Sequence, residues 1–125
     1  MIPYGRQDIS VEDIDKVVEV LTSDFLTQGP ACIQFEDEIS CLTGAKFTTA
    51  VNSATSALHL ACLALGVGAG DKVWTVPNTF VASANCALYC GAEIDFVDID
   101  LQTHNICLQS LEKKINLCKN VRIAA

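Results

Sequence analysis

The sequence predicts an α/β fold in which a mostly parallel sheet carries helices on both faces. From residue 47 onward, short β-branched and apolar runs alternate with helical runs, and this order of elements gives right-handed βαβ units. The strand runs are apolar without alternation, which is typical of strands buried on both faces. Three helical runs are followed by glycines, which favour the left-handed conformation that ends a helix: Gly44, Gly66 and Gly91.

Two helices are predicted before this alternation begins. Ser10 is suited to cap the first helix, with Asp13 three positions on in a variant of the capping box. An apolar stripe with helical spacing follows, made of Ile14, Val17, Val18 and Leu21. Residues 23–30 end in Gly-Pro and are expected to form a loop. The second helix then carries one apolar face, made of Phe35, Ile39 and Leu42.

The alternating part is expected to contain four strands and three helices. The strands are residues 47–51, 72–76, 93–99 and 121–125, the second of them stopped by Pro77. One helix covers 53–65. The next starts at Asn78 and Thr79, with Phe80 in its first turn. The last covers 108–118, and three of its side chains are expected to face inward: Leu108, Leu111 and Ile115.

Composition excludes several classes of function. The 125 residues amount to one domain or less, and 50% of them are hydrophobic while 18% are charged, so a folded core is expected. A net charge of -7 and a pI near 4.5 argue against nucleic acid and anionic membranes as partners. No basic segment precedes an apolar stretch at the start, and no uncharged run reaches the about 18 residues of a membrane span. We therefore expect a cytoplasmic protein.

The seven cysteines do not form a recognisable framework. Their number is odd, and no C-x-x-C pair occurs. Cys86 and Cys90 lie four positions apart, on one face of a helix, but among Ala, Leu and Tyr rather than further metal ligands. We expect reduced thiols that bind no metal and pack as small hydrophobic groups.

The stretch "NSATS" (52–56) is the first candidate site. It turns from the end of the expected strand 47–51 into a helix, and ligands of α/β sheets bind outside the carboxyl ends of the strands. A helix N-terminus has unpaired N–H groups and partial positive charge, which suit a phosphate. The hydroxyls of Ser53, Thr55 and Ser56 supply further donors. The alternative, which the pattern leaves equally open, is that Ser53 merely caps the helix.

The stretch "PNTFVASAN" (77–85) is the second candidate. Phe80 is expected over the same sheet edge as residues 52–56, where an aromatic side chain offers a flat apolar wall, although core packing is the default role of a Phe. Together the two loops fit an aromatic ring that carries a phosphate.

Other candidates are weaker. The glycines of 66–70 follow a helix, unlike a dinucleotide fingerprint. His59 is expected at a packing contact and His104 has no nearby nucleophile, while three acids are expected to form turns and caps: Asp95, Asp98 and Asp100.

The whole chain resembles the N-terminal part of DegT-type sugar-nucleotide aminotransferases, which are pyridoxal-phosphate (PLP) enzymes of the aspartate-aminotransferase fold. The matching stretches are "SDFLTQGPACIQFEDEI", "VNSATSALHLACLALGVGAGDKVWTVPNTFVASANCALYCGA" and "FVDIDLQTHNI". "IPYGRQDIS", "LTQGP" and "NSATSALHLA" are most similar to transaminases that aminate C4 of a UDP-linked 4-keto-6-deoxy-N-acetylhexosamine in pseudaminic acid biosynthesis.

The resemblance implies roles for particular residues. Thr55 and Ser56 match the positions that hold the PLP phosphate, and Phe80 matches the aromatic residue that stacks on the pyridine ring. A third set matches positions that touch the nucleotide sugar: Tyr4, Asp24, Phe25, Leu26, Thr27 and Ala54. The resemblance also implies a homodimer, with glutamate as the amino donor.

Other family features have no counterpart in the sequence. The lysine that binds PLP covalently, the aspartate that pairs with the pyridine nitrogen, and the small C-terminal domain all come later in the family, beyond Ala125. The resemblance thus implies that residues 1–125 are an N-terminal segment followed by the first part of the PLP-binding large domain. It also implies that this domain is truncated here and that the chain alone is inactive. Two alternatives are a non-catalytic binding or interaction remnant that keeps the phosphate loop, and a stand-alone nucleotide-binding α/β module. The missing glycine fingerprints argue against the module.

Overall fold

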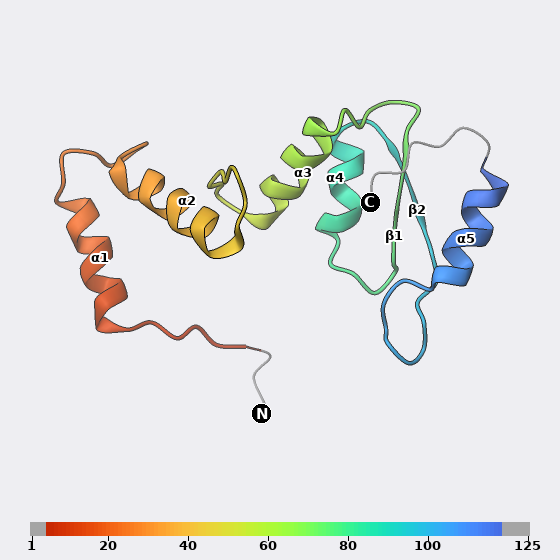
Figure 1. Ribbon diagram of the computed structural model, residues 1–125, viewed down its shortest axis with the longest axis horizontal. Coiled ribbons are helices and arrows are strands. Elements are labelled where there is room, and N and C mark those ends of the chain that lie inside the picture. Colours follow the sequence, from red (N-terminus) through yellow and green to blue (C-terminus); the bar gives the residue numbers. More distant parts are fainter. Residues whose placement is uncertain (1–4, 119–125) are drawn as a thin grey trace. The chain divides into compact units, whose positions relative to one another are not determined.

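The chain divides into two compact units, Met1–Ala50 and Val51–Ala125, and the computed structural model describes residues 5–118 (Figure 1). The first unit contains α1 (Val11–Leu21) and α2 (Pro30–Thr43). The second contains α3 (Ala54–Ala64), β1 (Lys72–Thr75), α4 (Ala82–Tyr89), β2 (Glu93–Phe96) and α5 (Leu108–Leu117).

The sequence predicts both helices of the first unit, and the structure shifts only the start of α2. The Asp13 N–H donates to Ser10 Oγ at 3.2 Å and the Ser10 N–H donates to Asp13 Oδ2 at 2.8 Å, which confirms the capping box of α1. The start of α2 is a small correction, because Pro30 belongs to the helix rather than to the loop. Proline is suited to this first position, where an N–H has no intrahelical partner. α2 ends at Gly44, whose φ of 72° is left-handed as expected.

The capping box gives the first testable prediction. Ser10→Ala removes the oxygen that accepts from Asp13, and is expected to destabilise α1 by about 1 kcal/mol. Hydrogen exchange of the α1 amides would measure the loss, because an uncapped first turn opens more often. Ser10→Asp is the matched control, since its carboxylate caps equally well. Unchanged exchange in Ser10→Ala would contradict the prediction.

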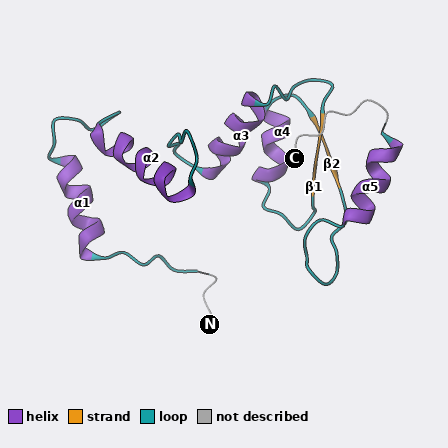
Figure 2. Ribbon diagram, in the orientation of Figure 1, coloured by secondary structure: helices purple, strands orange, loops and turns teal. Residues whose placement is uncertain are grey.

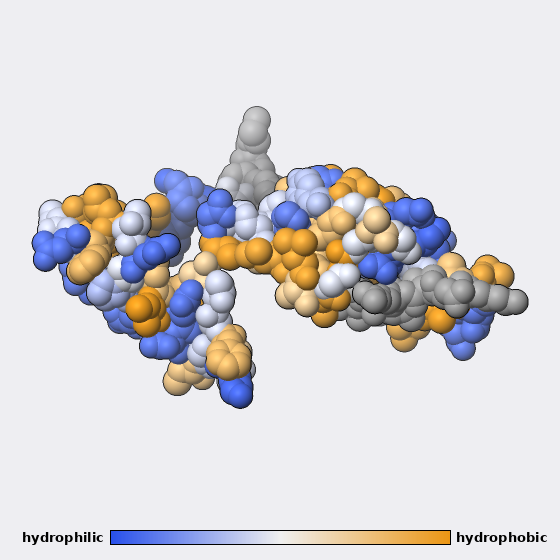
Figure 3. Space-filling model, turned by 90° about the horizontal axis from the view of Figure 1, so that it is seen from above, coloured by the Kyte–Doolittle hydropathy of each residue, from blue (hydrophilic) through white to orange (hydrophobic). Residues whose placement is uncertain are grey.

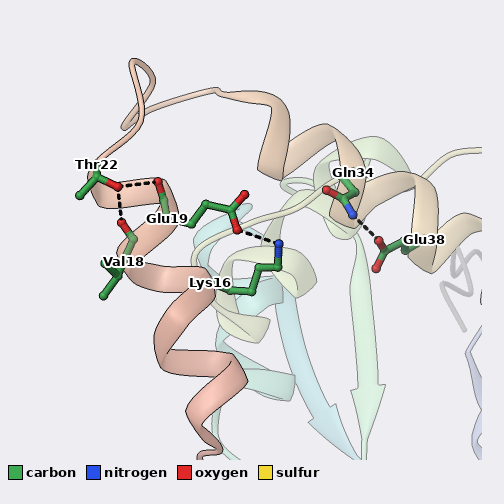
Figure 4. Close-up of polar contacts among 6 residues, drawn as sticks. All are labelled: Lys16, Val18, Glu19, Thr22, Gln34 and Glu38. Carbon is green, nitrogen blue, oxygen red and sulfur yellow. Dashed lines mark hydrogen bonds and ion pairs between the residues drawn. The ribbon is translucent and has the colours of Figure 1, made fainter.

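The polar contacts of α1 and α2 are surface pairs (Figure 4). Lys16 Nζ lies 2.7 Å from Glu19 Oε2, and Gln34 Nε2 donates to Glu38 Oε1 at 2.7 Å. At the end of α1, the Thr22 hydroxyl bonds to two backbone carbonyls, those of Val18 and Glu19. Exposed pairs of this kind contribute little to stability. The apolar stripe of α1 also lies at the surface, and Figure 3 shows apolar atoms, in orange, exposed on the molecule.

The second unit confirms the predicted α/β class. β1 and β2 pair in parallel, from Lys72 opposite Glu93 to Thr75 opposite Phe96, and α4 forms the crossover between them. Figure 2 shows α4 and α5 on opposite sides of the two strands. α3 packs against α4, where His59 and Tyr89 meet edge to face with ring centroids 5.3 Å apart. This confirms the packing role expected for His59.

The predicted strand at residues 47–51 is wrong. A strand needs a neighbouring backbone, and among residues 5–118 the sheet contains β1 and β2 alone. The 47–51 segment bonds instead to side chains of α2. The Ala50 N–H donates to Glu36 Oε1 at 2.8 Å, and the Thr48 and Ser40 hydroxyls lie 2.7 Å apart. The strand expected at 121–125 lies outside the described residues.

Two details of the helices also differ from expectation. α4 begins at Ala82 rather than at Asn78, because residues 77–81 form turns first, with the Thr79 N–H bonded to the Val76 carbonyl. Phe80 therefore precedes the helix. On α5, Leu111 is half-buried as expected, but Leu108, the first residue of the helix, is exposed, and Ile115 is 37% exposed.

Thiols form part of the core between α3, α4 and the strands. Cys62 and Cys86 are buried beside Val67, Ala87 and Ala92, which confirms that these cysteines pack as small hydrophobic groups. Burial, reinforced by the neighbouring Cys86 thiol, raises the pKa of the Cys62 thiol to about 11. At the start of α5, hydrogen bonds from Ser110 lower the pKa of Cys107. All seven cysteines are free.

The thiol environments predict an order of reactivity. With iodoacetamide at neutral pH, Cys107 is expected to alkylate well before Cys62, because the thiolate is the reacting form. After denaturation all seven should react.

The free energy of unfolding should also fall between pH 9 and 11, since Cys62 ionises at about 9.0 when unfolded and at about 11 when folded. Cys62→Ala should flatten this decline, and equal declines in the two proteins would contradict the assignment.

Candidate functional site

The N-terminus of α3 is the centre of the candidate site. Ser53 caps the helix, because its Oγ accepts from the Ser56 N–H at 3.2 Å. The Ser56 hydroxyl donates to Asn52 Oδ1 at 2.6 Å and lies 3.1 Å from Ser53 Oγ. The capping interpretation of Ser53 is therefore confirmed, and it accounts for one of the N–H groups at this end of the helix.

Capping leaves donors available for an anion. Within residues 5–118, the backbone N–H groups of Ala54 and Thr55 donate to no protein group, as expected for the first positions of a helix. The Thr55 side chain is half-buried beside them. No Asp or Glu occurs between residues 39 and 70 in a chain of net charge -7, although the Glu36 carboxylate accepts from the Ala50 N–H. Free N–H groups, small side chains and the positive end of the helix together fit a phosphate group.

Phe80 lies in the loop between β1 and α4, in the same unit as the phosphate-binding candidates. Its side chain is 74% exposed, so it takes no part in the core and is available to a ligand. The Thr79 and Ser83 hydroxyls, one on each side of Phe80 in the sequence, lie 2.9 Å apart. α3 packs against α4, and in Figure 1 both helices begin on the lower side of the view. An exposed aromatic ring here is suited to stack on a planar ligand.

A second loop adjoins the Phe80 loop at the carboxyl ends of the strands. Asn78 Nδ2 donates to the His104 carbonyl at 3.4 Å and so joins residues 77–81 to residues 99–106. Asp100 shapes the second loop by accepting from the Thr103 and Gln102 N–H groups, and these bonds hold its pKa below the ordinary value. The expectation that Asp100 forms a turn is confirmed. The part of the chain that the structure describes contains no group of three or more potential metal ligands.

The residues expected to contact a nucleotide sugar divide between the two units. Asp24, Phe25, Leu26 and Thr27 lie in the α1–α2 loop of the first unit, where the Phe25 and Leu26 side chains are exposed. The backbone approaches closely there, since a Cβ on Gly29 would lie 2.8 Å from Phe25 Cβ. Ala54 is the first residue of α3, in the second unit. Tyr4 lies outside the described residues.

Two positions in this site were missed by the sequence analysis. Asn52 controls the Ser56 hydroxyl, and Asn78 connects two loops. The signal for Asn52 was available, because an amide four positions before a Ser at a helix start is within reach of its hydroxyl. Asn78 carried no local signal, because its partner lies 26 positions away in the sequence.

Two lysines of the second unit are held in ion pairs. Lys72 Nζ lies 2.9 Å from Glu93 Oε2, and hydrogen bonding to Glu93 raises the pKa of this lysine. Lys114 Nζ lies 2.7 Å from Asp95 Oδ2 and donates to the Phe96 carbonyl at 2.6 Å, and its hydrogen bond lowers the pKa of Asp95. A lysine that attacks a carbonyl must lose its proton, so the raised pKa of Lys72 opposes that chemistry.

Comparison with known proteins identifies relatives over nearly the whole chain. The model of the DegT/DnrJ/EryC1/StrS aminotransferase family matches residues 7–121. The spore coat polysaccharide biosynthesis protein SpsC of Bacillus subtilis is 45% identical over 114 residues, 91% of this chain and 29% of that protein. A UDP-4-amino-4,6-dideoxy-N-acetyl-beta-L-altrosamine transaminase of Campylobacter jejuni is 42% identical over 116 residues, 92% of this chain and 30% of that protein.

Solved structures agree. Helicobacter pylori PseC, an aminotransferase of pseudaminic acid biosynthesis, matches with a TM-score of 0.86 and 33% identity, covering 97% of this chain and 32% of that one. The PLP form of the sugar aminotransferase Spr1654 from Streptococcus pneumoniae matches with a TM-score of 0.85 and 36% identity, covering 90% and 29%.

The chain spans about 30% of the length of the curated relatives it matches. Among residues 5–118, no helix is both long and apolar enough to cross a membrane. The family model covers most of the chain, and the relatives and solved structures named above are sugar aminotransferases or polysaccharide biosynthesis proteins. The chain therefore belongs to the DegT/DnrJ/EryC1/StrS aminotransferase family, whose cofactor is pyridoxal phosphate.

Proposed function

We propose that this chain is the N-terminal segment and the first part of the PLP-binding domain of a sugar-nucleotide aminotransferase. The reaction is the transfer of an amino group, from glutamate, to C4 of a UDP-linked 4-keto-6-deoxy-N-acetylhexosamine in pseudaminic acid biosynthesis. The C. jejuni transaminase and H. pylori PseC support this substrate class. We assign the lysine that binds PLP and the small domain to the part of the relatives' length that this chain does not span.

The observation that carries the proposal is the N-terminus of α3. There the N–H groups of Ala54 and Thr55 have no partner among residues 5–118, and the sequence from 39 to 70 contains no acidic residue. We assign the PLP phosphate to this end of the helix, with Thr55 and Ser56 as side-chain donors. Phe80 stacks on the ring from the β1–α4 loop. PLP, when bound, supplies the electron sink that transamination requires.

The nucleotide sugar is assigned to a second group of residues. These are Tyr4, Asp24, Phe25, Leu26, Thr27 and Ala54. Exposed Phe25 and Leu26 side chains support contact with a base or sugar ring, and Ala54 has no side chain beyond Cβ to obstruct a ligand. We further propose that the complete enzyme is a cytoplasmic homodimer. The exposed apolar stripe of α1 supports this proposal, because an exposed apolar surface is suited to contact a partner subunit.

A chimera tests this function. The chain replaces the matching 30% of the C. jejuni transaminase, and the product is assayed for PLP binding and for turnover of a UDP-4-keto sugar with glutamate. We expect turnover, and we expect Thr55→Val to weaken PLP retention by about fivefold through the loss of one hydroxyl donor. Thr43→Val is the matched control, because that hydroxyl bonds only within its own region of the chain. A chimera that binds PLP without turnover would favour a non-catalytic remnant.

A further inference from the structure

Gly29 lies where a side chain has no room. A Cβ at this position would lie 2.8 Å from Phe25 Cβ, far below the about 3.5–4.0 Å at which carbon atoms pack. The backbone does not itself require glycine, because a φ of -82° with a ψ of 178° is open to any residue. Helix capping does not require it either, since Ser or Asp suits the N-cap of α2 at least as well. Glycine is therefore needed here for the close approach of Phe25.

Phe25 is also held by Ser23. The Ser23 hydroxyl accepts from the Phe25 N–H at 3.3 Å and donates to the Val20 carbonyl at 2.8 Å, so it ties the Phe25 backbone to the end of α1. The Phe25 side chain is nevertheless 58% exposed. The loop thus fixes the backbone and the Cβ of Phe25 while it leaves the ring accessible.

A groove beside Phe25 offers space for part of a ligand. It has a volume of about 220 Å³ and lies between the end of α1 and the start of α2, where Phe25, Val20 and Pro30 form part of its lining. Pockets that hold a whole ligand have about 300–1,000 Å³, so this groove suits a single ring. An aromatic side chain in its wall is suited to contact a planar base or the apolar face of a sugar.

We propose that Gly29 is a positioning residue whose close contact keeps the Phe25 ring in place to meet the nucleotide sugar, an inference that rests on the function proposed above. A side chain that is already fixed in its binding position spares the ligand the entropy cost of ordering it. A Cβ at residue 29 would push Phe25 away and release the ring from this position. Binding of the nucleotide sugar should then weaken, while PLP, which is assigned to the second unit, should bind as before.

The test uses the chimera described above and UDP-N-acetylglucosamine, a UDP-linked N-acetylhexosamine that lacks the 4-keto group and so binds without reaction. Calorimetric titration measures its dissociation constant. Gly29→Ala is expected to raise this constant by about fivefold, the usual effect of losing one preorganised side chain. Gly29→Ser should raise it by at least as much, although Ser is the better N-cap, because its Cβ meets Phe25 in the same way.

Two controls separate positioning from a general loss of structure. PLP retention and the KM for glutamate should be unchanged in Gly29→Ala and Gly29→Ser. Gly68→Ala is the matched control variant, because a Cβ there would lie 3.9 Å from the nearest atom, the Cys90 carbonyl oxygen. It should leave the affinity for UDP-N-acetylglucosamine unchanged.

A double-mutant cycle shows whether Gly29 acts through Phe25. Phe25→Gly removes the Cβ that a side chain at 29 would meet, so in this background Gly29→Ala should change the dissociation constant by less than about twofold. An equal effect in both backgrounds, unchanged binding in Gly29→Ala and Gly29→Ser, or a loss of PLP retention in them would overturn the positioning role alone. No effect of Phe25→Gly, or no saturable binding by the unsubstituted chimera, would overturn the proposed nucleotide-sugar contact and the positioning role with it.

Discussion

The 125-residue chain is expected to form no stoichiometric covalent adduct with PLP and to catalyse no transamination at any concentration of the cofactor. A covalent link needs a lysine that reaches the ring and releases its proton. Lys72 and Lys114 are held in ion pairs with Glu93 and Asp95. Lys16 is paired with Glu19, which raises the pKa of the lysine.

Non-covalent binding is expected to survive in weakened form. Binding of PLP through one helix N-terminus and one aromatic ring face is expected to have a dissociation constant of roughly 0.1 to 1 mM. Inorganic phosphate should displace the cofactor, because it competes for the same N–H groups. Borohydride reduction followed by mass spectrometry would measure covalent attachment. A single lysine that is labelled stoichiometrically, or any turnover by the chain alone, would show that this account is wrong.

Ala87→Leu is expected to lower the free energy of unfolding of the second unit by about 1–3 kcal/mol, and by more if the backbone cannot adjust. Ala87 is 0% exposed and lies in the core cluster with Cys62, Cys86 and Ala92. Its carbonyl also accepts from the Cys90 and Ala92 N–H groups at the end of α4. A larger side chain would have to displace α4 from the strands, and would disturb those bonds too.

Urea denaturation monitored by the fluorescence of Trp74 on β1 would measure this change. Ala61→Leu on α3 is the matched control, since Ala61 is exposed and the same substitution there should stay within about 0.5 kcal/mol. Equal midpoints for Ala87→Leu and the unsubstituted chain would show that the core adapts more readily than its packing indicates.

Local signals predicted the helices and their ends, because each signal acts within a few residues. The Ser10–Asp13 capping box and the left-handed Gly44, Gly66 and Gly91 are all found in the structure. The strand at 47–51 could not be predicted in the same way. Its composition suits a strand, but strand formation depends on a backbone partner that local sequence does not specify. The start of α4 was displaced by turns after Pro77 for a related reason.

The site shows the same division. Thr55 and Ser56 could be proposed from a helix start with small polar residues, and the structure adds free N–H groups beside them. The sequence pattern could not predict the side-chain geometry. The partner that accepts the Ser56 proton depends on the orientation of the Asn52 amide. The sequence predicted Phe80 in the first turn of α4, whereas Phe80 precedes this helix. Residues 24–27 were assigned through resemblance alone, because no physical pattern in that loop distinguishes a ligand contact from an ordinary turn.

The parallel pairing of β1 and β2 has a consequence for how the second unit folds. A hairpin can zip from its turn, whereas these strands meet only after the chain between them has crossed over as α4. Loop-closure entropy is therefore lost before the ladder forms. Helix formation and strand pairing are then expected to share one rate-limiting barrier, so changes in α4 would slow folding as well as hasten unfolding.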